Sequence, residues 1–239
     1  MLHSDTAERI FADLHHEVSR QRTTRLQLDY IAALPLGAEP GRRSWTHRAL
    51  RVRVAESQAD RALAADVVKR RHYLGRWPAR PRTLILSYLA DLDGVERGPA
   101  GCAALVMFAL LPGNFHAARA LSVGQLETLS LVRMWRADDL EPQVVPDFTP
   151  EVLRTCMRRV RADWTARKLR PGGLRAEPRM VVTYADPGVG HDGATYTAAG
   201  ATDCGLAACG KRLFAWAIDL ELRPALHRLG AAIRGRAAA

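Results

Sequence analysis

The chain has 239 residues, of which 48% are hydrophobic, enough for one good core and an accessory element. Its formal net charge is +10, and its 35 basic residues are all arginines except Lys69, Lys168 and Lys211. No stretch of eighteen uncharged apolar residues occurs, which excludes a membrane-spanning helix, and the excess of positive charge favours a polyanionic partner over a merely basic enzyme.

Cysteine usage and the N-terminus indicate the compartment. The four cysteines are too few and too scattered for a disulfide framework, and the pair Cys204 and Cys209 is too weak a pattern for a zinc site. The first residues lack the basic-then-apolar order of a secretory signal. We therefore expect a reduced, cytoplasmic protein with no metal.

The N-terminal part is predicted to be an extension of the main domain. Residues 4–22 fit an amphipathic helix with Ile10, Phe11, Leu14 and Val18 on one stripe. Residues 34–44 are rich in Pro, Gly and Arg and are typical of a linker. This predicts a helix and linker over 1–45 and a single domain over 46–239.

The domain is predicted to alternate strands and helices in a mixed α/β arrangement. Apolar patterning and turn residues predict the order β-α-β-β-β-α-β-α-β followed by a C-terminal helix. The expected strands are 49–54, 83–89, 102–111, 127–135, 180–184 and 212–220, and the expected helices are 57–73, 149–168, 194–199 and 223–234.

Two segments before residue 170 stand out chemically. The exit of the helix over 57–73 mixes basic and aromatic side chains, namely His72, Tyr73, Arg76 and Trp77. Such side chains suit nucleic acid, although an aromatic plug under a loop is an equally good interpretation. Arg133 lies among apolar neighbours on a predicted strand, a costly position unless it meets an anion or a carboxylate.

A helix start is predicted at Thr149-Pro150-Glu151, with Thr149 as N-cap, Pro150 in the first helical position and Glu151 in the first turn. Free backbone N–H groups at a helix start suit a phosphate or a thioester donor, so Thr149 and Glu151 are candidate cofactor-binding residues. Most helix starts bind nothing, which makes this signal weak on its own.

The richest stretch is 179–205. A buried strand runs into Asp186-Pro187-Gly188, a turn signal, and a short helix follows. Asp186, His191, Asp192 and Tyr196 are thereby gathered at the carboxyl end of a strand, where open α/β sheets place their sites. The alternative is a turn-forming Asp, a solvated His and a half-buried Tyr.

Two motifs resemble a known family. Residues 131–135 (LVRMW) resemble the "LVR-hydrophobic" strand of the Mom family of phage DNA-modification proteins, a divergent branch of the GNAT acyltransferases. Residues 182–186 (VTYAD) with Gly190, His191, Gly193, Tyr196 and Ala198 resemble that family's "SYADxxxGHxGxIYqA" signature, and His72-Tyr73 resembles a weaker element. The predicted element order also resembles the GNAT fold, over about residues 48–220, while the usual pyrophosphate loop pattern is absent between 135 and 149.

The resemblance implies a GNAT-like fold and transfer of an acyl or glycine-derived group to the exocyclic amine of adenine in duplex DNA, which protects phage DNA from restriction in the host cytoplasm. The donor is acetyl-coenzyme A or an aminoacyl carrier. A poor amine nucleophile needs a base, for which Asp186 and His191 are the candidates. The resemblance places Tyr196 as the general acid.

The remaining candidates are assigned to the substrate side. Arg133 would hold an anion or orient Asp186, and we expect the two residues on neighbouring strands of one sheet. Tyr184, His72, Tyr73 and Trp77 are candidates for contact with a base that has left the stack, and Arg76 for a phosphate. A small-molecule N-acyltransferase and a non-catalytic nucleic-acid-binding module remain open as alternatives, distinguished by salt-dependent DNA binding and by a detectable product.

Overall fold

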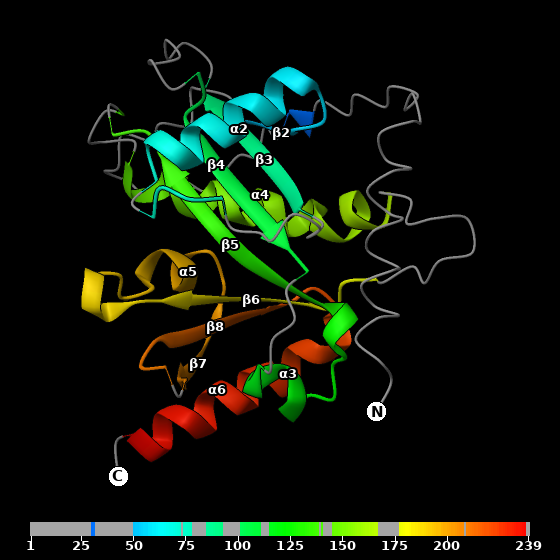
Figure 1. The fold of residues 1–239 in the computed structure, drawn as a ribbon. Helices are drawn as coiled ribbons and strands as arrows, with labels where there is room; N and C mark the ends of the chain where they lie inside the picture. The colour runs from blue at the N-terminus through cyan, green and yellow to red at the C-terminus, as the bar shows by residue number, and fades with distance from the viewer. Residues whose placement is uncertain are drawn as a thin grey trace, which may run out of the picture.

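The computed structural model describes residues 30–31, 50–72, 74–77, 85–92, 101–110, 115–138, 140, 145–166, 177–207 and 209–237 (Figure 1). Its helices are α2 (Gln58–Arg70), α3 (His116–Ala120), α4 (Val145–Ala166), α5 (Ala194–Ala198) and α6 (Arg223–Ala237), with 3-10 turns η2 (Gln125–Glu127), η3 (Pro187–Val189) and η4 (Leu220–Leu222). The strands are β1 (Tyr30–Ile31), β2 (Leu50–Val54), β3 (Ile85–Leu92), β4 (Ala104–Ala109), β5 (Thr128–Arg136), β6 (Met180–Ala185), β7 (Thr202–Leu206) and β8 (Arg212–Ala217).

These strands form one mixed sheet in the order β1-β2-β3-β4-β5-β6-β8-β7. The β5–β6 pair is parallel, and the other neighbouring pairs are antiparallel. Parallel neighbours need a crossover, and α4 supplies it between β5 and β6. The mixed α/β class is therefore confirmed, and the predicted elements occur in the predicted order with β1, α3 and β7 added.

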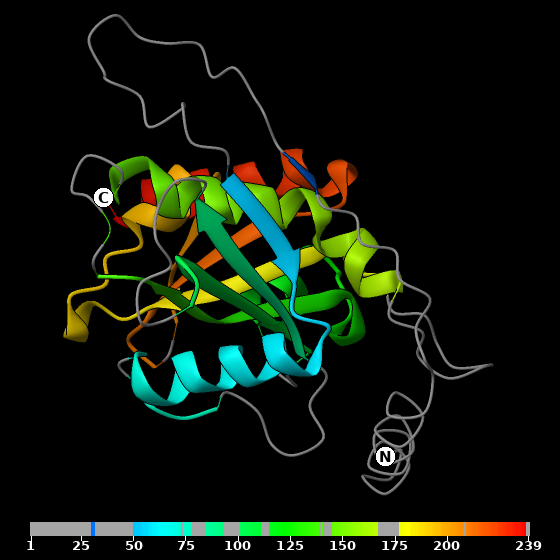
Figure 2. The ribbon, with the colours of Figure 1, turned by 90° about the horizontal axis from the view of Figure 1, so that it is seen from above.

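Helices cover both faces of the sheet. Figure 2 shows α2 and α4 on opposite faces of β2 to β5. Successive side chains of a strand point to opposite faces, so Tyr88 of β3 reaches Asp163 of α4 with a hydrogen bond of 2.7 Å. The main core includes side chains from α2, α4 and the strands between them.

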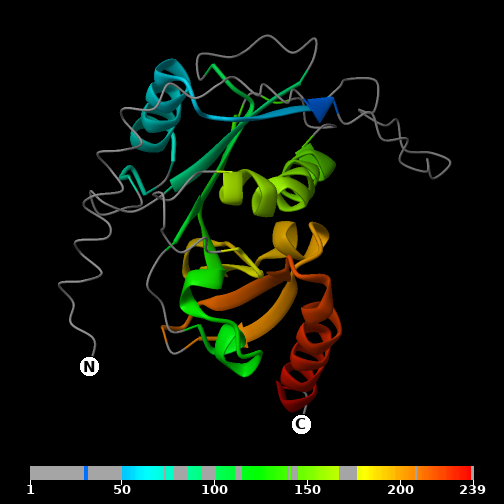
Figure 3. The ribbon, with the colours of Figure 1, turned by 90° about the vertical axis from the view of Figure 1, so that its right-hand side faces the viewer.

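A second apolar cluster lies at the other end of the sheet. There α3 and α6 pack on β6, β8 and β7, as Figure 3 shows at the end nearest the C-terminus. Met180 and Val182 of β6 point into this cluster, whereas Val181 and Ala185 point into the main core. Alternation along β6 thus places its two sides in two different hydrophobic environments.

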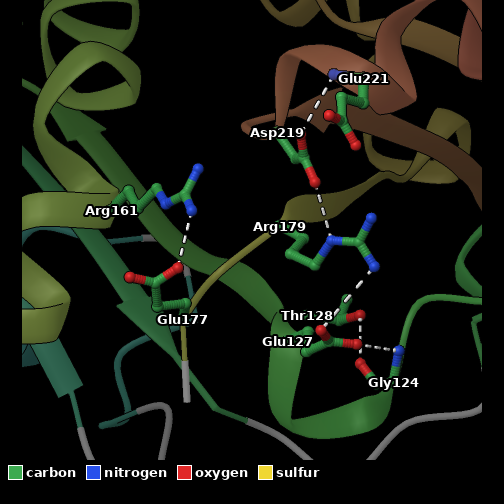
Figure 4. A network of polar contacts seen from close by, with 8 residues as sticks. All are labelled: Gly124, Glu127, Thr128, Arg161, Glu177, Arg179, Asp219 and Glu221. Carbon is green, nitrogen blue, oxygen red and sulfur yellow. Dashed lines mark hydrogen bonds and ion pairs between the residues drawn. The ribbon is translucent and has the colours of Figure 1, made fainter. Parts of the chain in front are cut away.

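Ion pairs hold the amino ends of β5 and β6 together (Figure 4). Arg179, just before β6, pairs with Asp219 at 2.8 Å and with Glu127, just before β5, at 3.8 Å. The Arg179 N–H also donates to the Glu127 carbonyl at 2.9 Å. Arg161 of α4 pairs with Glu177 at 2.7 Å, which ties the crossover helix to the same end.

Several predicted boundaries were wrong. The helix expected over 149–168 begins at Val145 instead, because burial of Phe148 in the main core holds an extra turn onto the protein. The segment 114–124 contains α3, and β7 was not predicted. The predicted N-terminal helix over 4–22 and linker over 34–44 lie outside the described residues.

Candidate functional site

The parallel strands β5 and β6 separate at their carboxyl ends. Their ladder joins Thr128 to Met180, Leu129 to Val181 and Ser130 to Val182, and no further pair follows. Beyond it, β5 stays with β4 to Arg136 and β6 stays with β8 to Ala185 (Figure 1). Past the ladder, the Thr183 Oγ1 donates a hydrogen bond to the Leu131 carbonyl at 3.0 Å.

A β-bulge in β5 lies at the same place. Leu131 pairs with Phe108 and Arg133 pairs with Met107, so Val132 is the extra residue on its strand. A bulge bends its strand and re-aims the side chains beside it. Arg133 is thus the first paired residue after the bulge, and it lies on the strand next to β6, which leads into Asp186, as expected.

Asp186 organises the loop that follows β6. Its side chain accepts the Gly188 N–H at 3.1 Å and pairs with the Lys211 Nζ at 2.8 Å. The His191 N–H donates to the Asp186 carbonyl at 3.1 Å, which closes the loop. The hydrogen bond from Lys211 holds the pKa of the Asp186 carboxyl below its usual value, aided by the charges of Lys211 and His191 and by the Gly188 N–H. Asp186 is therefore an ionised turn former and a weaker base than an ordinary carboxylate.

His72 is buried where α2 ends, at 7% exposure. Its Nδ1 accepts the Leu74 N–H at 3.1 Å, and its ring also hydrogen-bonds the backbone of Met134 in β5. Burial, reinforced by the positive charges of Arg133 and His191, lowers the pKa of His72 to about 4, so the ring is neutral near pH 7. His72, Arg133 and His191 are thus close enough for their charges to interact, and we treat them as one group.

Arg133 joins that group to the segment after α2. Its Nη1 donates to the Val132 carbonyl at 2.6 Å, and its Nη2 donates to the Arg76 carbonyl at 3.2 Å. The guanidinium therefore holds the exit of α2 against β5. His191 itself is exposed, so a substrate can reach its imidazole.

Two of the predicted aromatic side chains are exposed. Trp77 is 36% exposed after α2, and Tyr184 is 37% exposed at the end of β6. The Tyr184 ring lies 6.1 Å from that of Phe115, centroid to centroid. Arg76 is exposed as well, whereas Tyr73 lies outside the described residues. Two of the predicted aromatic contacts are thus available to a ligand.

Tyr196 packs in a different environment. Its ring lies 5.5 Å from that of Phe214 and 5.9 Å from that of Trp216, and both partners belong to the main core. The preceding Gly193 has φ +85°, and a Cβ there would meet the Phe214 ring at 2.1 Å, so only glycine fits. The role of Tyr196 as general acid stays a prediction.

The predicted cofactor-binding helix start is wrong. Because α4 begins at Val145, Thr149 and Glu151 lie beyond its first turn and are buried. Glu151 is paired with Arg154 and with Arg158, the latter at 3.2 Å. It therefore neutralises arginines of its own helix, and the argument for a phosphate or thioester at these two residues no longer applies.

Sequence reasoning missed Lys211 as a partner of Asp186. Lys211 follows the β7–β8 turn, in which Gly210 has φ +77° and donates to the Ala207 carbonyl at 2.9 Å. The Cys209-Gly210 dipeptide between two apolar runs was a usable turn signal. Without β7, however, nothing in the sequence placed this turn beside β6.

Comparison with known proteins leaves the chain without an assigned family. No family model matches the sequence. A search of curated proteins finds no match. The solved structure of a "putative acetyltransferase from Sphaerobacter thermophilus DSM 20745" is similar with a TM-score of 0.33 and 13% identity, over 70% of this chain and 92% of that one. A TM-score this low decides nothing about activity.

Within the described ranges, no group of three or more His, Cys, Asp or Glu side chains is placed to hold a metal ion. Among the described helices, none has the length and apolar character needed to cross a membrane.

Proposed function

We propose that the protein is a GNAT-like acyltransferase that modifies the exocyclic amine of adenine in duplex DNA and so protects that DNA from restriction. The observation that carries the proposal is an exposed imidazole, His191, beside the ionised Asp186 at the diverging ends of β5 and β6. The resemblance of residues 131–135 and 182–198 to the Mom family selects DNA as the substrate.

The chemistry follows from these neighbours. The adenine amine attacks the activated carbonyl of the donor, and His191 takes the proton that the amine loses as the N–C bond forms. The charge of the Asp186 carboxylate favours the imidazolium that results. Arg133 carries a positive charge suited to the oxyanion that develops on the donor carbonyl. The carrier then leaves, and Tyr196 is the predicted source of its proton.

The substrate class rests on charge and on exposed aromatic rings. A net charge of +10 suits a phosphate backbone. A base in a duplex must leave the stack to reach an enzyme pocket, and a flipped base is held by stacking on aromatic side chains. Trp77 and Tyr184 are the exposed rings that we assign to this contact.

The donor is an activated carbonyl, supplied by acetyl-coenzyme A or by an aminoacyl carrier.

Mass spectrometry of nucleosides tests the proposal. DNA from cells that express the protein should contain a modified deoxyadenosine that is missing from cells expressing His191→Ala at an equal soluble level. An unmodified nucleoside profile beside abundant, soluble wild-type protein would contradict the proposal. Acylation of small amines without DNA binding would instead identify a small-molecule N-acyltransferase.

A further inference from the structure

We propose that one face of α6 binds the phosphate backbone of the DNA, and that this face consists of Arg223, His227, Arg228 and Arg234. The identity of the polyanion as DNA rests on the proposed function. All four side chains are exposed. From Arg223 to Ala237 the helix contains no Asp or Glu, so its exposed side has only one sign of charge.

The opposite side of α6 is buried on the sheet. Leu226 is buried in the second apolar cluster, with Leu229 and Ile233 packed against the same cluster. A Cβ on Gly230 would meet the Thr202 Cγ2 at 2.4 Å, so the helix lies directly on β7. A membrane-surface helix inserts its apolar face into lipid. Since that face is already covered here, the basic face fits a soluble polyanion rather than a lipid surface.

The arginines of α6 differ from those of α4 in their partners. On α4, Arg158 pairs with Glu151, Arg159 with Asp163 at 3.2 Å, and Arg161 with Glu177. Within the part of the chain that the structure describes, Arg228 and Arg234 have no ion-pair partner. Their charges are therefore available to phosphates, whereas those of α4 are largely neutralised.

The shape of the face suits close approach. The small residues Ala231, Ala232 and Gly235 are exposed beside Arg228 and Arg234, and a Cβ on Gly235 would meet open space. Arg228 and Arg234 are six residues apart, about 9 Å along the helix axis. A phosphate backbone can therefore approach these two arginines closely.

The direction of α6 leads toward the candidate site. The helix begins beside Asp219 and Arg179, at the amino end of β6. Toward its carboxyl end, Ile233 lies against Gly205 of β7. The next residue, Leu206, pairs with Arg212 of β8, and Arg212 pairs in turn with Ala185 at the carboxyl end of β6. In Figure 1 the C-terminal end of α6 lies on the same side as the loop that follows β6. DNA held along α6 would thus run toward His191.

The test compares two double variants in which the same number of charges is removed. Arg228→Gln with Arg234→Gln neutralises the α6 face, and Arg158→Gln with Arg161→Gln neutralises paired arginines of α4. Binding of random-sequence duplex DNA is measured from about 50 to 300 mM salt. The α6 variant should lose about two units of salt slope and on the order of 10- to 100-fold in affinity near 100 mM salt. The α4 variant should bind nearly as the wild type does.

A second pair of variants guards against misfolding. Ala231→Glu places a negative charge in the middle of the face, and Ala231→Gln is its uncharged control; only the former should weaken DNA binding, with equal Tm values. Unchanged affinity and slope in the α6 variants, equal losses in the α4 variant, or preferential binding of anionic vesicles over DNA would overturn the α6 proposal alone. Wild-type protein that binds no DNA would overturn the proposed function as well.

Discussion

The two ends of the β5–β6 pair are built in opposite ways. At the amino end, Arg179, Glu127 and Asp219 form ion pairs and backbone hydrogen bonds across both strands. At the carboxyl end, the ladder stops after Ser130 and Val182, and a bulge at Val132 interrupts the pairing of β5 with β4. One end is therefore fixed by redundant polar contacts, while the other exposes side chains that can do chemistry.

The largest expected effect is at the diverging end. His191→Ala should reduce turnover by about 10²- to 10⁴-fold, the usual contribution of a general base. Because His191 is exposed, Tm should not change. Asp192→Asn is a matched control on the same loop, since an amide oxygen can still accept the Ala194 N–H that Asp192 accepts at 2.8 Å. Full turnover in His191→Ala would remove this end as the catalytic one.

Stability should depend on pH through His72. Its folded-state pKa of about 4 lies below the unfolded value of 6.5, so the unfolded chain binds the proton more readily. The stabilisation is complete above about pH 6.5 and is lost progressively as pH falls toward 4, by about 3 kcal/mol at most.

Denaturant titrations of wild type and His72→Gln between pH 7 and 4 measure this dependence. The free energy of unfolding of the variant should fall less steeply with pH, because the variant lacks the His72 ring. The carboxyl groups titrate in both proteins and do not contribute to the difference. Identical slopes would mean that His72 is not held neutral at this end of the strands.

Tyr196→Phe tests whether the catalytic site at the diverging ends of β5 and β6 includes Tyr196, whose ring packs against Phe214. The variant keeps the ring contacts with Phe214 and Trp216, so a change in turnover reports the hydroxyl alone. A general acid predicts a loss of about 10²-fold with DNA affinity unchanged. Wild-type turnover would restrict Tyr196 to packing.

The smallest effect is expected at the fixed end. Thr128 is buried, and its Oγ1 donates to the Gly124 carbonyl at 3.0 Å. Thr128→Val should cost about 1 kcal/mol of unfolding free energy, the typical worth of one hydrogen bond, and leave turnover per folded molecule unchanged. Thermal unfolding and nucleoside analysis together measure this, and a catalytic defect without a stability loss would contradict the division between the two ends.

The sequence by itself determined the class of fold and singled out the loop after β6 as the candidate site. Apolar runs with turn residues predicted β2 to β6, β8 and α2, because alternation and helical periodicity are local properties. Asp186 and His191 were found because a buried strand running into Pro-Gly has few structural solutions. The placement of Arg133 and Asp186 on neighbouring strands followed from the crossover rule for parallel strands.

Only the tertiary structure decided which side chains contact one another. Lys211 meets Asp186 through β7 and β8, which no local pattern linked to β6. The first turns of α4 form because Phe148 is buried, although Pro150 argues locally for a later start. The difference between the paired arginines of α4 and the exposed ones of α6 depends on which acids lie nearby in space, and charge along a chain does not contain that information.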